Sequence, residues 1–198
     1  MPTLFQINVV VNQGSTGKIA EQIGHLVLKK GWRSVIAYGR WPRKSESELI
    51  RVGNDWDMRV HALESRIRDN HGLCSRSATK ILINQIKEIN PDVIHLHNIH
   101  GYYLNFKILF EFLKEYNKPV VWTLHDCWTF TGHCPHFDMV GCQKWRQGCE
   151  HCLYHNHYPA SFFDDSKVMY KFKRKWFTNV DNLTLVTPSK WLADLVKE

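Results

Sequence analysis

The chain has 198 residues, of which 43% are hydrophobic, and this suits one globular domain with a sizeable core. Its formal net charge of +7 favours a polyanionic partner, such as a nucleic acid, an anionic membrane surface or a phosphorylated substrate. The apolar runs are far shorter than the roughly 20 residues of a membrane-spanning helix. The N-terminus also lacks the basic region and the cleavage site of a signal peptide, so we expect a cytoplasmic protein.

The first quarter of the chain predicts a strand, a glycine turn, a helix and two further strands. Residues 4–11 are β-branched and apolar, as in a buried strand, and the NQGSTG stretch breaks that run. Apolar side chains at helical spacing predict a helix over 18–30, which ends at Gly31. Residues 34–38 predict a second strand, and the polar loop that follows holds a short strand over 49–52.

The rest of the chain continues this alternation. The helix expected over 77–89 is amphipathic, with Ile81, Ile86 and Ile89 facing inward. The other expected elements are helices over 59–68, 104–116 and 165–178 and strands over 92–96, 119–124 and 183–187. Alternating strands and helices predict an α/β fold over 1–198: a doubly wound, mostly parallel Rossmann-like sheet with helices on both faces.

In such sheets, ligands bind beyond the carboxyl ends of the strands. The segment after the first strand contains two glycines, but a Walker loop would need glycine in place of Asn12 and Ser or Thr in place of Ile19, and the G-x-G-x-x-G spacing is missing too. Backbone N–H groups at the start of the helix still favour an anionic ligand there. The alternative is a turn that merely needs glycine torsions. The candidate binding residues are Gly14, Ser15, Thr16, Gly17 and Lys18.

Histidines follow two later strands. Strand alternation places His95 and His97 on one face, either as two ligands of one metal or as one packed histidine and one that faces a cleft beside Asn98. We favour the second interpretation, because no nearby carboxylate or thiolate completes a ligand set. His125, followed by Asp126, stands where a neutral imidazole can handle a sugar hydroxyl or a phosphate. The alternative is a buried histidine beside a capping aspartate.

A cysteine-rich excursion spans 127–157. Four cysteines, the last two in a C-x-x-C pair, predict a closed structural zinc site that fixes this excursion in place and takes no part in catalysis. Disulfides and free thiols are the alternatives, and His133, His136 and His151 are competing ligands. Cys74 and Cys127 are interpreted as small hydrophobic residues. The predicted zinc ligands are Cys134, Cys142, Cys149 and Cys152.

Basic and aromatic residues alternate over 167–175. On a helix, Val168, Phe172 and Trp176 would form an apolar stripe beside a cationic face. We interpret this as a surface helix whose stripe enters the core, with peripheral contact with an anionic membrane as the alternative. The same pattern, together with the cysteines, supports a competing function, a basic zinc-stapled nucleic-acid-binding module, although the residues at the strand ends suit a small-molecule cleft better.

Several motifs together resemble a known family. They are QGSTGKIAEQIG, SVIAYGR, INPDVIHLHNIHGYYLN, TLHDCWTFTGHCPHFD and LTLVTPSKWLADLV, and in this order they are similar to the N-terminal half of bacterial family-four glycosyltransferases. The resemblance implies two Rossmann-like domains that face a cleft. It also implies a retaining transfer from a nucleotide-diphosphate sugar to a polysaccharide or lipid-linked glycan, with no catalytic metal ion.

The resemblance also implies roles for individual residues. Gly14 to Gly17 resemble the loop that approaches the donor diphosphate and the acceptor, and His125 resembles the active-site histidine that contacts the transferred sugar. Asp126 would orient that loop, while His97 and Asn98 would line the cleft. The family's donor-binding domain carries two glutamates separated by seven residues, a pair that this sequence lacks. We therefore expect the chain to be the acceptor-side half, inactive alone, without the C-terminal donor-binding domain and at most peripheral at the inner face of the membrane.

Overall fold

The computed structural model describes residues 1–198 and is built around one six-stranded sheet in which every pairing is parallel. The strands are β1 (Thr3–Asn8), β2 (Arg33–Tyr38), β3 (Glu48–Arg51), β4 (Val93–Leu96), β5 (Val120–Thr123) and β6 (Leu183–Val186). The helices are α1 (Gly14–Lys29), α2 (Asp55–Arg68), α3 (Arg76–Ile89), α4 (Phe106–Glu115), α5 (Ser166–Phe177) and α6 (Lys190–Lys197).

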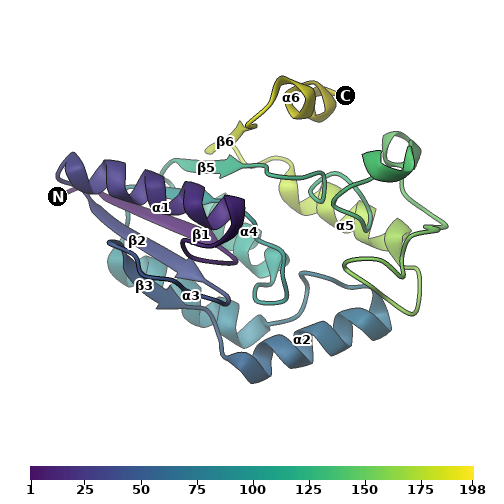
Figure 1. Cartoon of the computed structure of the whole chain (residues 1–198), viewed down its shortest axis with the longest axis horizontal. Helices are drawn as coiled ribbons and strands as arrows, with labels where there is room; N and C mark the ends of the chain where they lie inside the picture. Colours follow the sequence, from purple (N-terminus) through teal and green to yellow (C-terminus); the bar gives the residue numbers. More distant parts are fainter.

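The strand order is β3-β2-β1-β4-β5-β6, so the direction of winding reverses between β1 and β4. Helix α1 lies on one face of the sheet and α3 and α4 lie on the other (Figure 1). This arrangement confirms the predicted doubly wound Rossmann-like fold. In sheets of this kind the reversal opens a crevice beyond the carboxyl ends of the two central strands, which here are β1 and β4.

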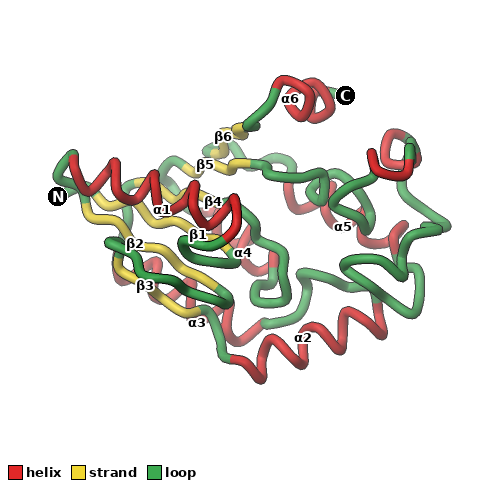
Figure 2. The backbone as a smooth tube through the Cα atoms, viewed as in Figure 1, coloured by secondary structure: helices red, strands yellow, loops and turns green.

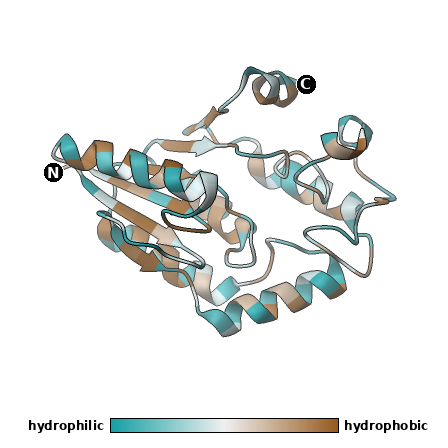
Figure 3. Cartoon of the chain, viewed as in Figure 1, coloured by the Kyte–Doolittle hydropathy of each residue, from teal (hydrophilic) through white to brown (hydrophobic).

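The central strands are buried and mostly apolar (Figure 3). Every residue of β1 is buried, as expected for a central strand covered on both faces. Two of them, Gln6 and Asn8, are nevertheless polar and fully buried. Buried polar side chains require hydrogen-bond partners, so these two positions carry specific contacts of their own.

Helix α1 begins at Gly14, four residues earlier than predicted, and the two glycines belong to its first turn. The reason is packing against the preceding loop: a Cβ on Gly17 would lie 3.0 Å from Val10 Cγ2 and 3.1 Å from Asn12 N. A glycine therefore lets this end of the helix approach the backbone closely, and Gly14, with φ +61°, has the backbone torsion that favours glycine.

Two other helices also differ from expectation. Helix α2 begins at Asp55 because Asn54 caps it, accepting from the N–H groups of Trp56 and Asp57 while the Asp57 carboxylate accepts from Asn54 N. In α3, Ile81 is 60% exposed, so its predicted inward position is wrong, whereas Ile86 is fully buried. Ala78, Leu82 and Ile86 share the buried face at helical spacing.

Helix α5 buries part of the predicted stripe, since Phe172 and Trp176 pack against the core, but it also buries a residue that was expected on the cationic face. Lys173 is only 1% exposed, while Val168, expected in the apolar stripe, is 41% exposed. The Lys173 ammonium donates to Trp128 O at 2.7 Å and to Thr131 O at 3.0 Å, and it lies 3.8 Å from the Trp128 ring centroid. These contacts compensate for its burial. The exposed basic residues of α5 are Lys167, Lys171, Arg174 and Lys175. Lys167 pairs with Glu150, so the cationic face on which the nucleic-acid interpretation depended is smaller than expected by Lys173 and partly neutralised.

The segment between β5 and α5 is a long irregular excursion that contains only two short 3-10 turns, Asp138–Val140 and Lys144–Arg146 (Figure 2). It is tied to α2 through His133, whose Nδ1 lies 2.6 Å from the buried Asp69 carboxylate. Lys173 of α5 also holds the excursion in place, because its ammonium donates to two carbonyls of this segment. No helix of the structure combines the length and the apolar character that crossing a membrane requires.

Candidate active site

Asn8, at the carboxyl end of β1, joins two of the predicted binding segments. Its side-chain carbonyl accepts from Asn98 N at 3.2 Å, and its amide nitrogen donates to Val10 O at 2.9 Å and lies 3.5 Å from Thr16 Oγ1. One buried amide thus links the start of α1 with the loop after β4. The structure brings these two parts of the predicted site together at the point where the sheet changes direction.

The N-terminus of α1 lies on this edge without a side-chain cap. Gly14, Ser15 and Lys18 are exposed, Thr16 is half-buried and Gly17 is buried. The first N–H groups of a helix have no partner within the helix and carry the positive end of its dipole. This end of α1 therefore suits an anionic group such as a diphosphate.

The histidines of β4 and the loop after β5 form a row. His95 stacks on His97 with 4.1 Å between ring centroids, which confirms that the two share a face. The His97 and His125 rings lie 5.4 Å apart, with His97 Nδ1 3.1 Å from His125 Nε2. Burial is the main cause that lowers the pKa of His97 to about 2 and that of His95 to about 4. Both rings are therefore neutral at physiological pH.

His125 and Asp126 are neighbours in sequence but have different partners. His125 is half-buried, and burial lowers its pKa although the Asp126 charge opposes this. Burial acts to raise the pKa of Asp126, but His100 and the Trp128 N–H outweigh it and the pKa is lowered. Asp126 Oδ2 lies 2.8 Å from His100 Nε2, and Oδ1 accepts from Trp128 N at 2.9 Å. Asp126 thus fixes the turn that follows His125, while the His125 ring pairs with His97.

Three contributing residues were missed from the sequence. Gln6 lies 3.1 Å from His97 Nε2, Asn8 bridges the two loops, and Thr123 lies 2.8 Å from His95 Nε2. A signal was present: Gln6 and Asn8 are polar residues in a mostly apolar strand, two apart and hence on one face.

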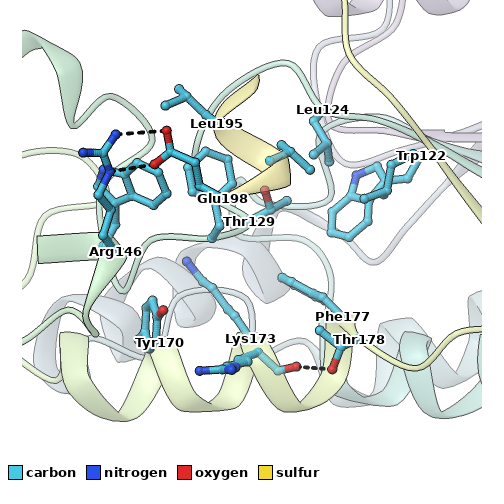
Figure 4. Close-up of a pocket in the computed structure, with 15 residues that line it drawn as sticks. Trp122, Leu124, Thr129, Arg146, Tyr170, Lys173, Phe177, Thr178, Leu195 and Glu198 are labelled. Atoms are coloured by element: carbon cyan, nitrogen blue, oxygen red, sulfur yellow. Dashed lines mark hydrogen bonds and ion pairs between the residues drawn. The ribbon is translucent and has the colours of Figure 1, made fainter. Parts of the chain in front are cut away.

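A cavity of about 560 Å³ lies away from this site (Figure 4). It lies between β5, α5 and α6, and Arg146 and Glu198 close one side with a salt bridge of 2.7 Å. Trp122 and Leu124 line it, and these alternate along the strand with Thr123 and His125. None of the predicted binding or catalytic residues reaches it, and its lining is mostly apolar.

The four predicted zinc ligands line one cavity of about 250 Å³ in the excursion. No cysteine of the structure is paired in a disulfide. No group of three or more His, Cys, Asp or Glu side chains is arranged to hold a metal ion. The excursion therefore gathers the four thiols around one space without placing them in ligand geometry, and zinc ligation stays a prediction. The residues concerned are Cys134, Cys142, Cys149 and Cys152.

Comparison with known proteins agrees with this geometry. The model of the family described as Glycosyltransferase Family 4 matches residues 19–198. The chain belongs to glycosyltransferase family 4. It is 29% identical over 206 residues to the putative colanic acid biosynthesis glycosyl transferase WcaC of Escherichia coli strain K12. That alignment covers 96% of this family-4 chain and 50% of the relative, so the chain spans about half the length of the curated relative it matches.

Proposed function

We propose that this chain forms the acceptor-side half of a retaining glycosyltransferase, which transfers a sugar from a nucleotide-diphosphate sugar to a polysaccharide or lipid-linked glycan. The observation that carries the proposal is that two features follow β1 and β5, the strands on either side of β4. One is the uncapped N-terminus of α1, and the other is the half-buried His125. The relative's description as a glycosyl transfer enzyme of colanic acid biosynthesis supports a polysaccharide or lipid-linked acceptor.

The two features suit two parts of the reacting donor. Negative charge grows on the departing diphosphate, and the free N–H groups at Gly14 to Thr16 would stabilise it. His125 would hold the transferred sugar through a ring nitrogen. In a retaining transfer the departing phosphate can itself take the proton of the acceptor hydroxyl, so no carboxylate base is needed. Asp126, bound to His100 and Trp128 N, fits a positioning role.

A second Rossmann-like domain would complete the cleft and bind most of the nucleotide. This is consistent with the match to half of the relative's length. The chain alone would therefore bind acceptor, or part of the donor, without turnover.

Two finer features belong to the same proposal. The four thiols around one cavity support a structural zinc site that closes when the metal binds, because four thiolates satisfy the tetrahedral preference of Zn²⁺. The net charge of +7 and the exposed Lys171, Arg174 and Lys175 on α5 support a cytoplasmic location with peripheral contact at the anionic inner face of the membrane. No catalytic metal is proposed.

The test is a titration of the ¹⁵N-labelled chain with UDP-glucose, GDP-mannose and a short DNA oligonucleotide, followed by amide chemical shifts. We expect at least one sugar nucleotide to shift resonances of Gly14 to Lys18, Asn98 and His125. His125→Asn should weaken that binding, whereas His136→Gln, at an exposed position of the excursion, should not. Shifts confined to the cavity beside Trp122, or DNA binding at α5 with no response to either sugar nucleotide, would contradict the proposal.

A further inference from the structure

A line of hydrogen bonds runs from helix α1 through the sheet to His125, and it begins at the amide of Gln6. Gln6 Nε2 lies 2.9 Å from Ala20 O, and both residues are fully buried. A backbone carbonyl can only accept, so the Gln6 nitrogen must face it as the donor. The orientation of the Gln6 amide is thereby set, and its oxygen faces the other way.

The next member of the line is His97. Gln6 Oε1 lies 3.1 Å from His97 Nε2, and an amide oxygen can only accept. His97 Nε2 therefore carries the hydrogen. His97 is 1% exposed, and burial holds its ring in the neutral form, in which only one nitrogen is protonated. The other nitrogen, Nδ1, is left as an acceptor.

The line ends at His125. His97 Nδ1 lies 3.1 Å from His125 Nε2, so the His125 nitrogen must donate. In neutral His125 the remaining nitrogen, Nδ1, then bears a lone pair. This atom has no hydrogen-bond partner in the protein and is not among the buried unpaired polar atoms, so it is open to a ligand.

We infer that Gln6 and His97 fix His125 in the Nε2–H tautomer, so that the site offers a ligand a hydrogen-bond acceptor. Such a group binds the hydroxyl of a sugar and repels the oxygens of the diphosphate in a sugar nucleotide, which have no hydrogen to donate. Phosphate recognition is thereby left to the N-terminus of α1. Gln6 and His97 act as positioning residues through His125. The identity of the ligand as a sugar rests on the proposed function, but the tautomer does not.

Long-range ¹H–¹⁵N correlation spectra of the chain labelled with ¹⁵N-histidine, at pH 7.5, test the inference directly. His125 and His97 should each show a protonated Nε2 and an unprotonated Nδ1. A protonated Nδ1 on His125 in the unmodified chain would overturn the inference, whatever the chain binds. This measurement needs no variant and no ligand.

Two variants separate positioning from general packing. Gln6→Leu removes the acceptor that selects the His97 tautomer, so we expect the His125 nitrogens to change from one tautomer to a mixture. Thr123→Val removes the hydroxyl partner of His95 in the same histidine row and should leave His125 unchanged. A single Nε2–H tautomer that persists in Gln6→Leu would contradict the role of Gln6.

The same spectra distinguish this inference from the proposed function. Adding UDP-glucose or GDP-mannose should move the His125 Nδ1 resonance, whereas inorganic sulfate, an oxyanion with no hydrogen at this pH, should not. A correct tautomer with no response to either sugar nucleotide would count against the proposed function and leave the tautomer standing. A response of Nδ1 to sulfate alone would overturn the assignment of His125 to a hydroxyl.

Discussion

The fold buries His61, His95 and His97 and keeps their rings neutral. Burial lowers the pKa of His61 to about 3, of His95 to about 4 and of His97 to about 2. In the unfolded chain each would titrate near its ordinary value of about 6.5. Below that value the unfolded state binds protons that the native state cannot, so the unfolding free energy is highest above pH 6.5 and decreases as the pH falls toward 4.

This predicts that the unfolding free energy decreases steeply as the pH is lowered below about 6.5. Each of the three histidines contributes a slope of about 1.4 kcal/mol per pH unit. His95→Gln should reduce the slope by about that amount between pH 6 and 5. Urea unfolding at pH 7, 6 and 5 measures it, with the exposed His136→Gln as the matched control. Equal slopes in the two variants would show that His95 is not held neutral by the fold.

At the same scale, the sequence predicted some site residues and not others. His97 and His125 could be selected as candidates from their place just after predicted strands, because the carboxyl ends of parallel strands form the ligand-binding edge of such a sheet. Gln6 could not be assigned, since its partner His97 is 91 residues away and the pairing depends on the register of β1 against β4.

Among the elements, α5 and the excursion that packs against it were predicted least well. Of the predicted inner face, Phe172 and Trp176 pack against the core but Val168 is exposed, whereas Lys173, expected on the cationic face, is buried. Its acceptors are the carbonyls of Trp128 and Thr131, in a segment with no regular structure. Sequence periodicity contains no information about such loop carbonyls, so a buried lysine could not be anticipated. The positions of all six strands, by contrast, followed from apolar runs bounded by turns.

The excursion is also the element on which zinc binding is tested. We expect one zinc per chain by elemental analysis, and two reactive thiols in the folded holo protein at most, those of Cys74 and Cys127. Cys149→Ser should lose the metal, while Cys74→Ser, outside the excursion, should keep it. A metal-free chain in which every thiol reacts, even after zinc is supplied, would disprove the site.

For the whole molecule, the alternation of strands and helices predicted the fold class, and the strand order with its reversal at β1 and β4 came from the structure. The structure was also needed to show which basic residues lie on the surface. Removing Lys173 from the exposed set leaves Lys167, Lys171, Arg174 and Lys175 on α5, and Lys167 is paired with Glu150, so the free cationic surface there is smaller than the sequence suggested.

Peripheral membrane contact predicts cosedimentation with vesicles that contain anionic lipid, and weaker binding as salt increases. Replacing Lys171, Arg174 and Lys175 by Gln should reduce it at least tenfold, at about 1 kcal/mol for each charge near the surface. A control that replaces Lys29, Lys30 and Lys80 removes the same charge from exposed positions elsewhere. Equal binding by the two variants would mean that net charge, and not α5, attracts the protein.

Strand β6 has a practical consequence for anyone who handles this protein. It is one of the two edge strands of the sheet, it pairs only with β5, and its Leu185 and Val186 are 46% and 41% exposed. An apolar edge with unpaired backbone groups is a template on which another chain can add a strand. Concentrated samples should therefore self-associate through this edge, and a lysine at position 185 would be the natural substitution to keep them monomeric.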